Sequence, residues 1–146
     1  MKPEHEDARV ARVVAMFESI SAADVARLGD FYAGDARFKD PFNDVQGVPA
    51  IQRVFAHMFA ALDEPRFVVS DIVVDGDQCF LTWDFLFRFK RFSRVPRAVH
   101  GSSHLRFDAQ GRIALHRDYW DAAEELYEKL PLVGGLMRWL KRRANS

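Results

Sequence analysis

The chain has a single cysteine, no net charge and no long apolar run, and each lack excludes a class of protein. Cys79 alone cannot form an internal disulfide framework, and this thiol content fits a reducing compartment, so we expect a cytoplasmic protein. No apolar stretch approaches the roughly 20 residues of a membrane-spanning helix. The acidic first seven residues lack the apolar core of a signal peptide. Lysine plus arginine (21) equals aspartate plus glutamate (21), so no nucleic-acid partner is expected.

Aromatic side chains, by contrast, are abundant on a chain of single-domain size. The 146 residues are 49% hydrophobic, which is enough to bury a core without a metal ion or a disulfide. Thirteen phenylalanines and three tryptophans are a heavy aromatic load for this length. They indicate that a large apolar surface is packed, or that an apolar molecule is bound.

The spacing of apolar residues predicts helices in the first half of the chain and strands in the second. Helical periods run over 7–19, 21–34 and 48–62. Strand patterns run over 67–74, 79–89, 97–107 and 112–120, with a hairpin signal at Asp75-Gly76. Helical patterns return at 122–129 and 136–143. Helices followed by an antiparallel meander predict one α+β domain.

The segment from Tyr32 to Phe42 contains the first candidate for a chemical role, Asp40. An aspartate directly before a proline lies in extended backbone, and Phe38, Pro41 and Phe42 surround it with apolar surface. Such surroundings disfavour the charged form of a carboxyl group, which suits a general base working near neutrality. An alternative from the same residues is that Asp-Pro only shapes a turn.

The motif Tyr-Ala-x-Asp-Ala-x-x-x-Asp-Pro-Phe at 32–42, with 24–59, 105–108 and 111–120, resembles a known superfamily. It is similar to the SnoaL-like and ketosteroid isomerase-like branch of the nuclear-transport-factor-two-like proteins. The resemblance implies a cone-shaped α+β roll, in which a curved antiparallel sheet wraps around N-terminal helices and leaves a deep apolar pocket. We expect this domain to span residues 1–121. A C-terminal helical tail, 122–146, would pack on the domain or on a partner subunit.

The same resemblance implies site residues, but it does not carry over a complete steroid isomerase. The isomerase's base matches Asp40, whereas its two oxyanion donors, a tyrosine and a protonated aspartate, fall on Met16 and Ser103. A thioether cannot donate a hydrogen bond, and a hydroxyl is a weaker acid than a carboxylic acid. Losing one such donor costs about a hundredfold in rate or more. Steroid isomerisation by the known route is therefore not expected.

Strand parity predicts what lines the pocket instead. Trp120 matches a pocket-facing tryptophan of the isomerase, and the period of two then turns Asp118 and His116 inward. Ser103 and Gly101 face inward on the preceding strand, where the glycine leaves room for a ligand ring or a close backbone approach. The expected catalytic groups are Asp40, His116 and Asp118, over an apolar floor of Met16, Phe17, Phe55, Met58 and Phe59. The alternative is that Asp118 pairs with an arginine and that His116 lies partly exposed at the rim.

The opposite parity places His100 and His104 on the outer face of the sheet. A metal site needs three or four converging ligands, so we expect no metal ion and no cofactor. Relatives of this fold dimerise through that convex face, which predicts a homodimer. The basic and aromatic segment 85–97 resembles a single-strand nucleic-acid platform, but strand packing accounts for it better. We expect the basic tail to cover the pocket mouth or to pack on a partner subunit. Contact of the tail with an anionic membrane surface is the less favoured alternative.

The sequence therefore predicts a domain that holds a small, largely apolar molecule in its interior. Two functions remain open. One is cofactor-free acid–base chemistry, such as isomerisation, cyclisation or addition of water, with Asp40 as base, His116 or Asp118 as acid or water orienter, and Ser103 as a weak oxyanion donor. The other is a non-catalytic ligand-binding or protein-interaction module of the same fold.

Overall fold

The computed structural model describes residues 5–91, 95–125, 139–140 and 142–144. Its helices are α1 (Ala8–Ser19), the 3-10 helix η1 (Ala22–Asp30), α2 (Val48–Ala61) and α3 (Ala122–Glu125). Its strands are β1 (Tyr32–Lys39), β2 (Asp44–Gln46), β3 (Leu62–Asp75), β4 (Gln78–Phe89), β5 (Arg97–Phe107) and β6 (Ile113–Tyr119). Within these residues, no helix combines the length and the apolar character needed to cross a bilayer.

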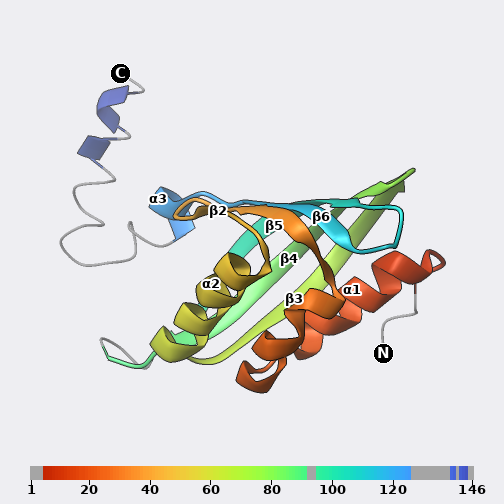
Figure 1. Cartoon of the computed structure of the whole chain (residues 1–146). Helices are drawn as coiled ribbons and strands as arrows, with labels where there is room; N and C mark the ends of the chain where they lie inside the picture. Colours follow the sequence, from red (N-terminus) through yellow and green to blue (C-terminus); the bar gives the residue numbers. More distant parts are fainter. Residues whose placement is uncertain (1–4, 92–94, 126–138, 141, 145–146) are drawn as a thin grey trace.

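Six strands form one curved sheet in the order β2-β1-β6-β5-β4-β3, and α1 and α2 lie within its curve (Figure 1). This confirms the α+β roll. The pairing of β1 with β6 is parallel, however, whereas every other neighbouring pair is antiparallel. Parallel neighbours need a long connection, which α2 and the hairpins from β3 to β6 provide. The sheet is therefore mixed, where the sequence pattern predicted an antiparallel one.

The two long helices begin and end where local chemistry predicts. The side chain of Asp7 accepts a hydrogen bond from the backbone N–H of Arg9 and so caps α1. Helix α2 follows Gly47, whose φ of 92° favours glycine, and has Pro49 in its first turn. Each helix turns one apolar face to the sheet, and the buried residues of the two faces are Val10, Val13, Val14, Met16, Phe17, Ile51 and Phe55.

The second predicted helix is shorter than expected, because part of it is a strand. Helix η1 ends at Asp30, and Gly34 lies inside β1 rather than at a helix end. Strand β1 pairs with β2 on one edge and with β6 on the other, and a register irregularity falls between Tyr32 and Arg37. These long-range pairings, with Tyr32 and Phe38 buried, override the local helical pattern.

Most of the predicted C-terminal helix lies outside the described residues, which leave out 126–138, 141 and 145–146. The described part that follows β6 is α3, and it contacts β5. The proposed packing of the rest of segment 122–146 stays a prediction.

Gly101 has a structural role that differs from the one expected of it. A β-carbon built at this position would lie 2.6 Å from Cη2 of Trp83 and 3.0 Å from Cβ of Trp120. The space over Gly101 is thus filled by protein side chains. The glycine permits a close approach of Trp83 to the backbone of β5 and does not make room for a ligand.

We expect Gly101→Ala to destabilise the fold by about 1–3 kcal/mol, since overpacking a well-filled core costs this much. The β-carbon has to displace Trp83, whose approach defines one wall of the interior. The measurement is the free energy of unfolding in urea. Gly34→Ala is the matched control, because its β-carbon meets nothing within 4 Å. Equal stability of the two variants would contradict this account of Gly101.

Candidate functional site

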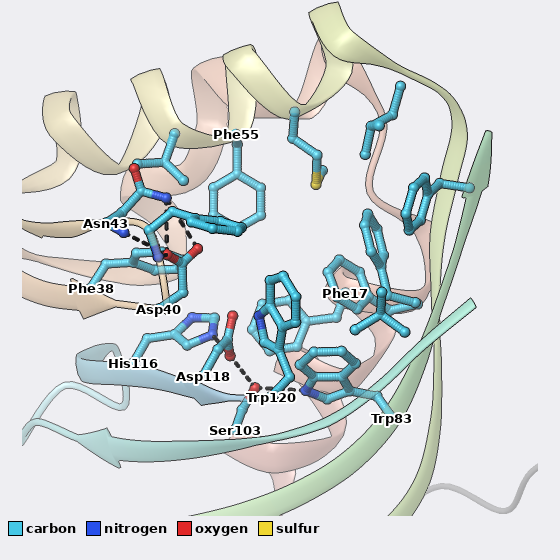
Figure 2. Close-up of a pocket in the computed structure, with 18 of the residues that line it drawn as sticks. Phe17, Phe38, Asp40, Asn43, Phe55, Trp83, Ser103, His116, Asp118 and Trp120 are labelled. Atoms are coloured by element: carbon cyan, nitrogen blue, oxygen red, sulfur yellow. Dashed lines mark hydrogen bonds and ion pairs between the residues drawn. The ribbon is translucent and has the colours of Figure 1, made fainter. Parts of the chain in front are cut away.

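A cavity of about 360 Å³ lies between the concave face of the sheet and the helices. We call it the aromatic cavity, because ten of its 21 lining residues are aromatic. Its polar lining residues are few: Asp40, Asn43, Ser103, His116 and Asp118. Figure 2 shows these polar groups together on one side, with aromatic and aliphatic side chains around the rest.

One side of the aromatic cavity is a continuous row of rings. Alternate residues of β4, from Trp83 to Phe89, point to the same face of the strand. The ring of Phe67 in β3 stacks on Phe85 with centroids 4.5 Å apart and meets Trp83 edge-on at 5.4 Å. Phe87 continues the row at 5.1 Å from Phe85. This row, which we call the aromatic wall, both packs the core and presents ring surface to the cavity.

A chain of hydrogen bonds holds the polar side of the cavity. Nε1 of Trp83 donates to Oγ of Ser103 at 2.8 Å, and this hydroxyl donates to Oδ1 of Asp118 at 2.5 Å. Nε2 of His116 lies 2.7 Å from the same Oδ1. Nδ1 of His116 lies 2.7 Å from the hydroxyl of Tyr32. Five side chains from four strands thus form one network, part of which is visible in Figure 2.

The network also fixes where its protons lie. Burial, and to a lesser degree the charge of Asp118, raises the pKa of the Tyr32 hydroxyl well above its usual value. Tyr32 therefore keeps its proton and donates a hydrogen bond to Nδ1 of His116. The imidazole ring must then be neutral, with its own proton on Nε2. That Nε2–H donates to Asp118. His116 is 4% exposed, and its ring contacts those of Phe17, Tyr32 and Phe38.

Two donors converge on one of the two oxygens of Asp118. Oδ1 accepts from both Ser103 and His116. Figure 2 shows the other oxygen pointing into the cavity. The side chain is only 13% exposed. Two donors on one oxygen stabilise the charge in apolar surroundings, while the second oxygen remains available to whatever occupies the cavity.

Asp40 both shapes a turn and lines the cavity, so the two readings of this residue combine. Its Oδ1 accepts from the backbone N–H groups of Phe42 (2.8 Å) and Asn43 (2.7 Å) and from Nδ2 of Asn43 (3.0 Å). Its Oδ2 accepts from the same amide at 3.1 Å. These donors fix the orientation of the Asp40 carboxyl group at the turn, while its side chain lines the cavity.

The structure brings most of the predicted site residues together. The predicted residues that line the cavity are Phe17, Asp40, Phe55, Met58, Ser103, His116, Asp118 and Trp120. Met16, Phe59 and Gly101 lie outside this lining. Successive helical residues point about 100° apart, so when Phe17 and Met58 face the cavity, their neighbours Met16 and Phe59 turn into the surrounding core. Gly101 is covered by Trp83, as described above.

Sequence reasoning missed three contributors to the site. Tyr32 opens the very motif that contains Asp40, but its contact with His116 joins residues 84 apart in the chain. Asn43 follows Asp40 by three residues and needed the turn geometry to be recognised. Trp83 lies within the strand pattern 79–89, and only the pairing of β4 with β5 shows its bond to Ser103.

The outer face of the sheet carries the remaining histidines. Nδ1 of His100 lies 2.9 Å from Oδ1 of Asp84, and Nε2 of His104 lies 2.9 Å from Oε1 of Gln78. The ring of His104 also stacks on Phe80 at 4.4 Å. Among the residues that the structure describes, no three His, Cys, Asp or Glu side chains are grouped as metal ligands.

Comparison with known families gives the chain its place. The model of the SnoaL-like domain matches residues 13–116. The chain belongs to the SnoaL-like domain family. No curated protein matches the sequence.

Solved structures similar to this SnoaL-like domain share its fold at low sequence identity. One is a hypothetical protein with a ketosteroid isomerase-like fold from Catenulispora acidiphila, in complex with trimethylamine: TM-score 0.72, 18% identity, covering 84% of this chain and 92% of that one. A protein assigned as a SnoaL-like polyketide cyclase from Shewanella denitrificans gives a TM-score of 0.70 at 16% identity. The match covers 83% of this chain and 98% of that one. An LEH-like epoxide hydrolase of M. tuberculosis gives a TM-score of 0.66 at 16% identity, and the match covers 80% of this chain and 85% of that one.

We expect Tyr32→Phe to destabilise the SnoaL-like domain by about 1–3 kcal/mol, since it leaves a buried acceptor, Nδ1 of His116, without its donor. Nitrogen-15 NMR of the wild-type ring should show a neutral imidazole protonated on Nε2. Tyr119→Phe is the control, because Tyr119 is 48% exposed and its loss of a hydroxyl should change stability by less than about 0.5 kcal/mol. A wild-type ring protonated on Nδ1 would contradict the assigned network.

Proposed function

We propose that this SnoaL-like domain binds a small, largely apolar molecule in the aromatic cavity and performs acid–base chemistry on it without a cofactor. Asp118 is the group that accepts a proton. The observation that carries this proposal is the arrangement of its carboxylate: Oδ1 is held by Ser103 and His116, while Oδ2 faces the cavity. A general base must reach the proton it removes, and in this interior Oδ2 is placed to do so.

The size and lining of the cavity support an apolar ligand. About 360 Å³ falls within the usual range for small-molecule sites. Ring surface from the aromatic wall suits an apolar body, and the few polar groups on one side suit a single polar or reactive end. Such an arrangement orients a ligand, because only one end of it can meet Asp118.

The chemistry follows from the position of that carboxylate. In an isomerisation, Asp118 takes a proton from a carbon beside a carbonyl group, and the electron pair of the broken C–H bond forms an enolate. The same proton returns to another carbon, so none is consumed. In an addition of water or a cyclisation, Asp118 instead takes the proton from the attacking water or carbon. The attacking atom bonds to an electrophilic carbon, a C–O single bond or C=O π bond at that carbon breaks, and the oxygen that receives the electron pair takes up the proton. The structural relatives named as an epoxide hydrolase and a polyketide cyclase make both types reasonable for this fold.

The other polar residues take roles that differ from the first expectation. Asp40 has three donors on Oδ1 and shares the cavity with Asp118, so we propose it as the second acidic group rather than the base. The hydroxyl of Ser103 donates its hydrogen bond to Asp118, so Ser103 does not serve as an oxyanion donor. His116 has both ring nitrogens engaged and acts as a positioning residue. The indole N–H of Trp120, which has no acceptor among the described residues, is the donor proposed for a developing oxyanion.

A non-catalytic binding module is the second candidate, and one observation favours it. The two positions that match the oxyanion donors of steroid isomerases hold Met16, which packs in the core, and Ser103, whose proton is already used. A protein that only sequesters its ligand needs shape and apolar area and requires no such donors.

We also propose that the convex face of the sheet contacts a second copy of the chain. Strand register places Val68, Val73, Phe80 and Tyr119 on that face, and all four are exposed. The pairing of charged and polar groups between them, such as Asp84 with His100, resembles the mixed surface of protein interfaces. Sedimentation analysis should give a dimer, and a monomer at all concentrations would contradict this.

Asp118→Asn should lower turnover by about a hundredfold or more, the usual contribution of a general base. Native mass spectrometry of the wild-type protein and of this variant identifies co-purifying compounds, and these are then given to the wild type. We expect conversion by the wild type, detected as a new product by liquid chromatography and mass spectrometry. Asp84→Asn is the matched control, since Asp84 pairs with a histidine on the outer face and should retain full activity.

The outcome separates the two candidate functions. A bound compound that the wild type leaves unchanged would reject the enzyme and favour the binding module. Conversion that is equally fast in Asp118→Asn would reject Asp118 as the base.

A further inference from the structure

The charges around the aromatic cavity are all of one sign. Its described lining includes two carboxylates, Asp40 and Asp118, and neither lysine nor arginine. His116 adds no positive charge, because the hydroxyl of Tyr32 donates to its Nδ1 and the ring is neutral. Hydrogen bonds from neutral donors stabilise both carboxylates but do not cancel their charge.

Two cationic side chains share a recess with these carboxylates. Lys39 and Arg117 line a second, adjoining recess that Asp40 and Asp118 also border. Within the described part of the chain, neither carboxylate forms an ion pair with them. The guanidinium of Arg117 lies over the ring of Tyr119, 4.7 Å from its centroid. These cations are therefore outside the aromatic cavity, and its interior keeps an excess of negative charge.

We infer that the molecule bound in the aromatic cavity carries a cationic amine, either a protonated or a quaternary ammonium group, on an otherwise apolar frame. This inference rests on the proposed function, because it names the ligand class of the same site. Unit charges attract strongly at short range in surroundings of low dielectric constant. A ligand cation beside Asp118 and Asp40 supplies the charge that the protein does not.

The rings at the polar side of the cavity fit the same group. Phe42 meets Trp120 edge-on with centroids 5.5 Å apart, and Phe38 lies 4.7 Å from the ring of His116. Figure 2 shows Phe38 and Trp120 next to the two carboxylates. The face of an aromatic ring attracts ammonium groups, and quaternary ammonium ligands are recognised in this way. The ammonium end would lie here, with the apolar frame along the aromatic wall.

The same arrangement selects against anions. A ligand with a carboxylate or a phosphate would bring a third negative charge into the cavity, with no described lysine or arginine in the lining to pair with it. Burying an unpaired charge is strongly unfavourable. The cavity thus distinguishes ligands by charge as well as by apolar area.

The test uses two probes of the same shape that differ in charge. Benzyltrimethylammonium carries a permanent cation, and 2,2-dimethylpropylbenzene has carbon in place of the nitrogen. Because Trp83 and Trp120 line the cavity, their fluorescence reports binding of both probes. We expect Asp118→Asn and Asp40→Asn each to weaken binding of the cation by about tenfold or more. Binding of the neutral probe should change by less than about twofold, which also shows that the variant cavity is intact.

Asp75→Asn is the matched control. Asp75 is an exposed residue beside the turn between β3 and β4 and does not line the cavity. The substitution therefore removes one negative charge at a place outside the cavity. It should leave both affinities unchanged. If the neutral probe binds the wild type and the cation does not, or if neither aspartate variant changes the preference for the cation, the inference is overturned while ligand binding in the cavity stands. If neither probe binds the wild type, the proposed function fails with it.

Discussion

A single buried carboxylate, that of Asp118, determines how the interior of this protein is organised. An ionised group in an apolar cavity is costly unless donors meet it, and here Ser103 and His116 do so on one oxygen. Those donors are themselves held by Trp83 and Tyr32. We assign to Asp118 a fixed negative charge with one oxygen open to a cavity lined by rings, and every functional proposal made for the chain follows from that assignment.

The sheet is what makes this arrangement possible. Ser103 of β5 and Asp118 of β6 are direct register partners, and His116 lies opposite Phe38 across the parallel pairing with β1. A slip of one residue in β6 would turn its whole inward set to the outer face. The packing of Trp83 over Gly101 completes the network from the neighbouring strand. The residues that stabilise the fold and those that shape the cavity are therefore largely the same.

The sequence was informative wherever a local period decides the outcome. The resemblance of Trp120 to a pocket-facing tryptophan, together with the period of two along β5 and β6, predicted that Ser103, His116, Asp118 and Trp120 share one interior, and all four line the cavity. Contacts between distant segments escaped prediction, because no local pattern encodes them. The parallel partner of β1, the bond between Tyr32 and His116, and the ring that fills the space over Gly101 are of this kind. The family resemblance supplied the roll but not the distribution of protons and charges inside it.

The central claim, an ionised Asp118 open to the cavity and held by neutral donors, is tested most directly by neutron crystallography of the deuterium-exchanged protein. The account predicts deuterium on the hydroxyl of Tyr32, on Nε2 of His116 and on Oγ of Ser103, with none on either oxygen of Asp118. Deuterium on the Asp118 carboxyl group, or a side chain turned away from the cavity, would contradict it.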